Sequence, residues 1–135
     1  VLAHTGRTGT PAFMPEESSA ASFIGISAED TFRKVASRDW YALGCCLFLM
    51  LLGQRGARVH RLSKKTVLLP PAEEDIPRVL ESFADALVSS GHADALRLTL
   101  SLTERDVNHR ADAGAIRSSQ FLQDAIAEAE RLIAS

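Results

Sequence analysis

The sequence predicts an all-α domain organised around one long apolar segment. Residues 39–53, DWYALGCCLFLMLLG, carry no charge after Asp39. A helix that is apolar on every side belongs inside a core, and leucine, alanine and methionine favour a helix over a strand. The segment is too short to cross a bilayer, which takes about 20 apolar residues. We therefore expect a buried central helix over Asp39–Leu52, ended by Gly53.

The remaining helices are predicted from the spacing of apolar residues. Pro77–Ser89 and Asp94–Leu102 each place their apolar residues on one side, as amphipathic helices do. Residues 121–133 repeat the pattern, which predicts a closing helix with one face packed on the domain. The C-terminal part of the chain, 77–135, should therefore be helical.

A further helix start is indicated before the central segment. Ser27 is followed by Ala28, Glu29 and Asp30, a capping serine with acids in the next turn. The pattern predicts a short helix over 28–36, after which Ser37 or Asp39 would cap the central helix.

Residues 55–71 begin with a basic run and end in two prolines. A basic run of this kind is usually a solvated loop, which is the structure that the pattern favours. Docking of a substrate or partner is the less favoured alternative.

Composition limits the classes of function. The 135 residues are 46% hydrophobic and 24% charged, as expected of a packed soluble domain. A net charge of −2 gives no electrostatic case for binding nucleic acid or a membrane. Cys45 and Cys46 point about 100° apart on a helix and are typical of core thiols in a reducing compartment. We expect an intracellular, cytoplasmic protein without a membrane span.

Three motifs occur in order along the chain: GTPAFMPEE at 9–17, DWYALGCCLFLMLLG at 39–53 and LTERDVNHR at 102–110. Their order resembles that of motifs in the large lobe of the eukaryotic-type Ser/Thr protein kinases. Residues 9–17, GTPAFMPEE, are similar to the kinase peptide-substrate loop G-T-P-x-[YF]-M-A-P-E. Residues 39–53 are similar to the central large-lobe helix, and residues 102–110, LTERDVNHR, to the pattern L-L-x-x-D-P-x-x-R. A weaker match, IRSSQFL at 116–122, follows I-K-x-H-P-F-F. The D-W-aromatic and R-D-V-N-x-R forms most resemble the AGC group and, within it, the G-protein-coupled receptor kinases.

The resemblance implies roles for particular residues. The substrate-binding residues would be Gly9, Thr10, Pro11, Ala12 and Phe13, with Thr10 beside the catalytic aspartate of the missing loop. Thr5 and Thr8 would be candidate activation-loop phosphorylation sites, although unmodified loop residues are the more favoured interpretation.

Three charged residues would hold the lobe together. Glu17 would form a buried ion pair with Arg110, since the kinase glutamate and arginine at these positions do so; a one-residue deletion would put Glu16 in that role. Asp39 would cap its helix and accept backbone hydrogen bonds from the catalytic loop. Leu49 stands where many AGC kinases carry a glutamate that reads basic substrates, and residues 18–36 include an insertion relative to most kinases.

The resemblance also shows what is missing. The Gly-rich loop, the small-lobe lysine, H-R-D-x-x-x-x-N and D-F-G all lie upstream of the peptide-substrate loop in kinases, and none occurs in this sequence. No catalytic residue, cofactor or metal is therefore assigned to the chain, and its four histidines lack metal-ligand spacing. ATP and Mg²⁺ would bind only the complete kinase.

Two other interpretations remain open. The chain begins with Val1 and not with Met, which suggests part of a longer protein whose partners are a protein or peptide substrate and the N-terminal kinase half. A pseudokinase-like binding or scaffold module is the alternative. An unrelated all-α interaction domain, with accidental motif matches, is the third.

Overall fold

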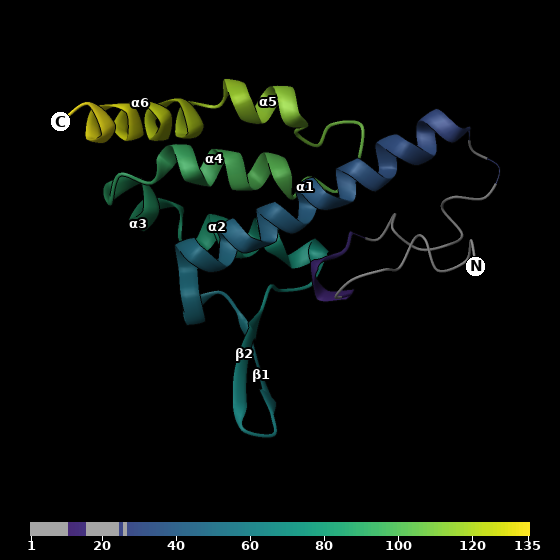
Figure 1. The fold of residues 1–135 in the computed structure, drawn as a ribbon. Coiled ribbons are helices and arrows are strands. Elements are labelled where there is room, and N and C mark those ends of the chain that lie inside the picture. The colour runs from purple at the N-terminus through teal and green to yellow at the C-terminus, as the bar shows by residue number, and fades with distance from the viewer. Residues whose placement is uncertain (1–10, 16–24, 26) are drawn as a thin grey trace.

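The computed structural model describes residues 11–15, 25 and 27–135, which form a mostly helical domain with one β-hairpin (Figure 1). The helices are α1 (Ala28–Leu52), α2 (Ile76–Ser82), α3 (Ala84–Ser89), α4 (Ala93–Leu102), α5 (Ala113–Ser118) and α6 (Gln120–Ala134). The described residues also form short 3₁₀ turns: η2 (Pro11–Phe13) before α1, η5 (Gly53–Arg55) after it and η6 (Glu73–Asp75) before α2. Strands β1 (Arg58–Leu62) and β2 (Lys65–Leu69) form the hairpin. The all-α expectation is confirmed for the body of the domain.

The helix α1 begins where the capping serine predicts but is longer than expected. The Ser27 hydroxyl accepts a hydrogen bond from the Asp30 amide at 3.1 Å, which confirms Ser27 as the N-cap. The prediction of two helices, the second capped by Ser37 or Asp39, was wrong: the helix is continuous to Leu52. Residues 28–43 contain no glycine or proline to interrupt it. Gly53, with a φ of +57°, ends it as predicted.

Only one face of α1 is buried, so the expectation of a helix enclosed on every side was also wrong. The buried residues follow one another at spacings of three or four: Ser37, Tyr41, Gly44, Cys45, Phe48 and Leu52. The opposite face carries Leu43, Cys46 and Met50, and the Met50 side chain is 80% exposed. The helix is apolar on both faces, but the described residues cover one of them.

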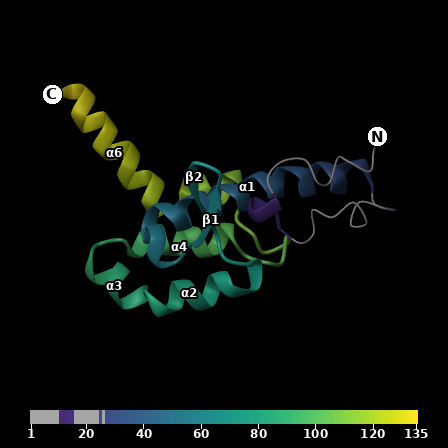
Figure 2. The same ribbon diagram turned by 90° about the horizontal axis from the view of Figure 1, so that it is seen from below.

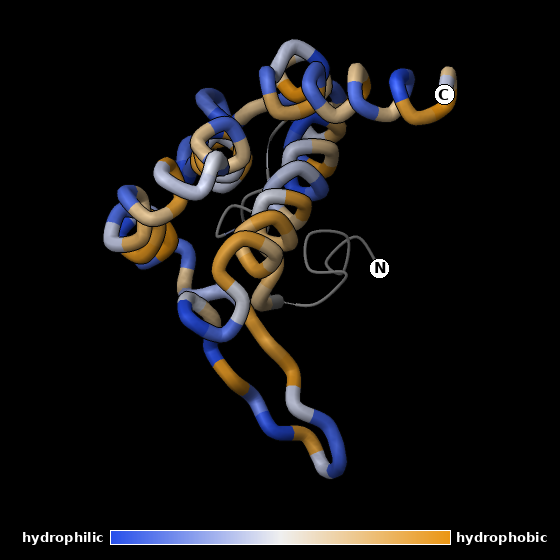
Figure 3. Tube along the Cα trace, turned by 90° about the vertical axis from the view of Figure 1, so that its left-hand side faces the viewer, coloured by the Kyte–Doolittle hydropathy of each residue, from blue (hydrophilic) through white to orange (hydrophobic). Residues whose placement is uncertain are grey.

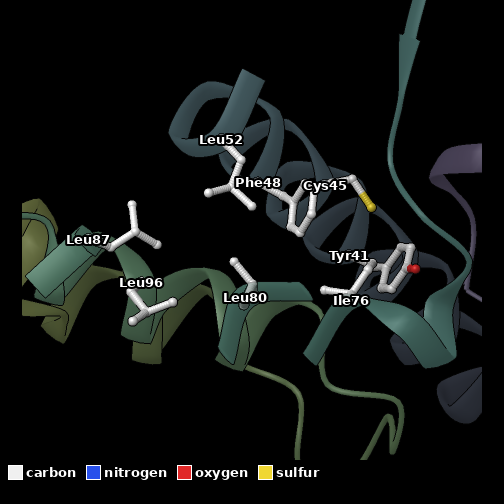
Figure 4. Close-up of a cluster of buried hydrophobic side chains, with 8 residues drawn as sticks. All are labelled: Tyr41, Cys45, Phe48, Leu52, Ile76, Leu80, Leu87 and Leu96. Atoms are coloured by element: carbon white, nitrogen blue, oxygen red, sulfur yellow. The ribbon is translucent and has the colours of Figure 1, made fainter. Parts of the chain in front are cut away.

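The main core forms where α1 crosses α2, α3 and α4. Figure 4 shows four α1 side chains facing four from the other helices. The cluster consists of Tyr41, Cys45, Phe48 and Leu52 with Ile76, Leu80, Leu87 and Leu96. A second cluster, Leu98, Leu102 and Ala111 with Trp40, Leu47 and Ile116, joins α1 and α4 to α5. The central position of α1 is therefore a result of packing on several helices at once.

At Gly44, α1 lies directly against the C-terminal end of α4. A Cβ added there would lie 2.7 Å from the Thr103 Cγ2 and 2.8 Å from the Leu102 Cβ. These atoms belong to short, buried side chains that cannot swing away. The glycine is thus required by the helix crossing and not by its backbone conformation.

Replacement of Gly44 by valine should lower the free energy of unfolding by about 1–3 kcal/mol, because overpacking forces the two helices apart. Urea unfolding followed by circular dichroism measures the change. Gly114, where an added Cβ would come no closer than 3.4 Å to the Asp112 carboxylate, is the control site. Equal losses at both positions would contradict the close crossing.

The basic segment after α1 is a β-hairpin, where the sequence predicted a loop. β1 and β2 pair antiparallel, with Arg58 opposite Leu69 and Leu62 opposite Lys65. Ser63 and Lys64 form the two-residue turn, and the φ of +45° at Ser63 is the kind of value that tight hairpin turns use. The β-branched residues Val59, Thr66 and Val67 favour strands. The hairpin extends away from the helices (Figures 1 and 3).

The C-terminal helices lie close to their predicted positions, but their packing differs from the prediction. α4 lies as predicted, whereas the helix expected over Pro77–Ser89 is two helices, interrupted where the Phe83 amide bonds the Leu80 carbonyl at 3.2 Å. α6 forms, but the prediction of a packed face was wrong. None of its residues is buried, Ile133 is 84% exposed, and the helix extends beyond the other helices (Figure 2).

By length and composition alone, one described helix could cross a membrane. The segment Ala28–Arg55 contains an 18-residue window of mean hydropathy 1.4, and one third of that window is buried inside the domain. Part of this apolar character is explained by the core that α1 forms with α2 and α4. The absence of a membrane span stays a prediction.

Candidate functional site

The described part of the predicted substrate loop lies against α1. Pro11–Phe13 form the η2 turn, Phe13 packs on the main core, and Pro15 is fully buried. Gly9 and Thr10 lie outside the described residues. Because Phe13 already contacts the core, its position is set by α1, while the role of Pro11, Ala12 and Phe13 in binding a peptide stays a prediction.

Arg110 is the most enclosed charged residue among those described, with 7% of its surface exposed. Its Nε donates a hydrogen bond to the Glu104 carbonyl at 2.8 Å, and its Nη1 donates one to the Ser37 hydroxyl at 3.0 Å. The guanidinium also lies over the Tyr41 ring, 5.2 Å from the ring centroid. Arg110 therefore fastens the segment after α4 to the first half of α1.

The sequence identified Arg110 but missed the two α1 residues that receive it. Ser37 and Tyr41 are four residues apart and share the buried face of α1. The four-residue spacing is visible in the sequence. It places Ser37 and Tyr41 on one face only if a single helix contains both residues, which the sequence did not predict. Glu17, Glu16, Thr5 and Thr8 lie outside the described residues, so the Glu17–Arg110 pair and the phosphorylation sites remain predictions.

Asp39 lies on the exposed side of α1, eleven residues after its first residue. The capping interpretation was therefore wrong, because capping needs a helix end. Asp39, Leu43, Cys46 and Met50 follow one another at spacings of four, three and four, so they form one stripe along the solvent side of the helix. We call these four residues the open stripe. Leu49, beside it, is half-buried against the main core.

Tyr41 and Cys45 are neutral parts of the core. Burial raises the pKa of the Cys45 thiol to about 12 and that of the Tyr41 hydroxyl well above its usual range. Both groups are therefore protonated at neutral pH, and neither a thiolate nor a phenolate forms there. Cys46, the next residue, is exposed.

The two thiols should therefore differ in reactivity. At pH 8, a disulfide reagent such as Ellman's should modify Cys46 rapidly and Cys45 only after unfolding. Substitution of Cys46 by serine should remove the rapid phase, whereas substitution of Cys45 should leave it. Two thiols of equal reactivity in the folded chain would contradict the orientation of α1.

Stability should fall at alkaline pH. Because the pKa of Cys45 is raised from 9.0 to about 12 on folding, its stabilising effect is complete below pH 9 and is lost as pH rises towards 12. Tyr41 acts in the same direction. Urea midpoints between pH 8 and 11 measure the loss, which should be smaller in the Cys45→Ala variant than in the parent chain. A midpoint independent of pH over that range would contradict the burial.

The described residues offer grooves but no metal site. A groove of about 400 Å³ lies beside Arg110, between the first half of α1 and residues 107–112. No group of three histidine, cysteine, aspartate or glutamate side chains suited to a metal occurs within the described ranges. The His109 Nδ1 lies 3.1 Å from the Asp106 carboxylate on the surface.

Comparison of the chain with protein-family models, with curated proteins and with solved structures found no match.

Proposed function

We propose that the chain is the C-terminal part of the large lobe of a Ser/Thr protein kinase of the AGC type. In the complete protein, ATP and Mg²⁺ would be held by a small lobe and a catalytic loop, and the γ-phosphoryl group would pass to a serine or threonine of a protein substrate. The 135 residues would supply the helical scaffold and the floor on which the peptide lies. Alone, they would not transfer phosphate.

The observation that carries the proposal is the buried Arg110. The kinase motif places an arginine at this position where it is enclosed, and an ordinary surface arginine would not hydrogen bond a buried serine across 73 residues of sequence. A buried guanidinium is stable when a carboxylate accompanies it, and the motif supplies Glu17 for that purpose. The order of the other motifs adds support.

The open stripe supports the same proposal. Leu43 and Met50 are exposed along one line of α1, and contiguous exposed apolar side chains often mark a surface that a partner covers. The kinase motif places the catalytic loop against this helix, with Asp39 as its hydrogen-bond acceptor. In the complete kinase, Leu43, Cys46 and Met50 would be covered on that side.

The alternative is a pseudokinase-like binding module, favoured by the sequence MPEE in place of M-A-P-E and by Leu49 in place of a substrate-reading glutamate. Neither change affects a group that takes part in phosphoryl transfer. Leu49 also packs on the core, so its character is compatible with a scaffold role.

The experiment is a phosphoryl-transfer assay on the native protein, purified from its source and incubated with γ-labelled ATP, Mg²⁺ and a mixture of basic and acidic peptides. The proposal predicts transfer to serine or threonine by the native protein and none by residues 1–135 alone. ATP binding without transfer would favour the pseudokinase alternative. Transfer by the 135 residues alone would contradict the assignment of catalysis to a missing part.

A further inference from the structure

The charge of the chain is divided between two regions of opposite sign. Residues 53–72 contain five of the 15 lysine and arginine residues and none of the 17 aspartate and glutamate residues. The rest of the chain has ten cations against all 17 acids, a net charge of −7. The overall value of −2 therefore conceals a basic segment and an acidic remainder of the chain. The basic segment contains the hairpin, which extends away from the helices (Figure 3).

Two of the five cations have structural roles at the base of the hairpin. The Arg58 Nε donates to the Pro70 carbonyl at 2.8 Å, which ties β1 to the end of β2. Arg55 lies over the Phe83 ring, 5.6 Å from its centroid, and its Nε donates to the Leu52 carbonyl at 3.3 Å. These contacts account for Arg55 and Arg58 but not for the three cations nearer the end of the hairpin.

The other three cations, Arg61, Lys64 and Lys65, gather at the far end. All are exposed, and within residues 11–15, 25 and 27–135 none of the three forms a salt bridge. Leu62 lies among them with half its surface exposed, and Val59 is 54% exposed. We call residues 61–65 the hairpin tip. It combines unpaired positive charge with the exposed side chain of Leu62.

The tip presents its cations around its end and not along one face. Side chains alternate along each strand, so the register puts Arg61 on one face of the hairpin and Leu62 and Lys65 on the other, with Lys64 in the turn. A hairpin that binds a groove or pairs with another strand uses one of its faces or one of its edges. Charge on all sides of an end suits a flat surface approached end-on.

We propose that the hairpin tip binds an anionic phospholipid surface, with the three cations at the headgroups and Leu62 at their boundary with the acyl chains. The strands rise about 3.4 Å per residue, so the tip stands about 14 Å beyond Arg58. The Debye length in physiological salt is about 8 Å. This separation screens the acidic body from the lipid charge while the tip touches it. Nucleic acid fits less well, because residues 53–72 contain no phenylalanine, tyrosine or tryptophan for base stacking.

The test is sedimentation of the native protein with phosphatidylcholine vesicles that contain 30% phosphatidylserine, at physiological salt. A lysine or arginine near such a surface contributes about fivefold to binding. The triple variant R61Q/K64Q/K65Q should therefore bind roughly a hundredfold more weakly than the parent. The variant R78Q/R97Q/R131Q, which removes the same charge from the body, should bind as the parent does.

Substitution of Leu62 by serine should weaken binding severalfold without changing its salt dependence. All of these side chains are exposed, so folding is retained, and circular dichroism verifies it. The proposal is overturned if phosphatidylserine does not increase vesicle binding by the native protein, or if the body variant loses as much vesicle affinity as the tip variant. It is also overturned if duplex DNA displaces the vesicles from the tip. It does not depend on phosphoryl transfer by the protein.

Discussion

Replacement of Phe48 by alanine should lower the free energy of unfolding of the chain by about 3–5 kcal/mol. The Phe48 side chain is fully buried in the main core, between Cys45 and Leu52 of α1 and the residues of α2 and α4 that face them (Figure 4). Its removal deletes apolar contacts and leaves a cavity. The surrounding helices cannot all move inward to fill that cavity, because each is held by its other contacts. Most domains are stable by only 5–15 kcal/mol, so the variant should be close to unfolding at 25 °C.

Met50 is the matched control, since it is two residues away on the same helix and is 80% exposed. Its replacement by alanine should change stability by less than about 0.5 kcal/mol. Urea unfolding of both variants measures the difference. Similar losses at the two positions would show that the open face of α1 is covered in solution and would contradict its burial pattern.

Replacement of Arg110 by methionine should cost about 3–5 kcal/mol if Glu17 is its partner, because the carboxylate is then left buried and uncompensated. Loss of the hydrogen bonds to Ser37 and to the Glu104 carbonyl would alone cost less, about 1–3 kcal/mol. The magnitude of the effect therefore reports on the ion pair.

A double-mutant cycle assigns the partner. Glu17→Gln should cost nearly as much as R110M, and the double variant much less than the sum of the two. Glu16→Gln is the control and should be nearly neutral. A costly E16Q with a neutral E17Q would move the pair to Glu16, and neutral effects of both would remove the strongest support for the kinase proposal.

The sequence was sufficient for the two ends of α1 and for α4, but not for the continuity of α1 or for what covers the helices. The end of α1 at Gly53, the Ser27 cap and α4 follow from local rules that act within a few residues. The start of the central helix was misplaced because a polar residue such as Asp39 also stands inside helices. Whether Asp39 starts a helix or lies inside one depends on packing, and the burial of Ser37 and Tyr41 on one continuous face shows that it lies inside.

Two errors share another physical cause. The exposed stripe of α6 and the open stripe of α1 have the composition of packed faces, and composition alone cannot show whether a partner is present. The hairpin was interpreted as a loop because its basic run was given more weight than the strand propensity of Val59, Thr66 and Val67. The net charge of −2 sums a basic hairpin tip with an acidic remainder of the chain, so it does not show where the charges lie.

The measurement that tests the central claim most directly is the sequence of the native transcript upstream of the codon for Val1, taken together with the mass of the endogenous protein. The kinase proposal predicts an open reading frame that encodes a small-lobe lysine, H-R-D-x-x-x-x-N and D-F-G in that order, and a protein much larger than 135 residues. A native protein that starts near Val1, or an upstream sequence in which those motifs are broken, would contradict it and leave a binding module built on a kinase-like scaffold.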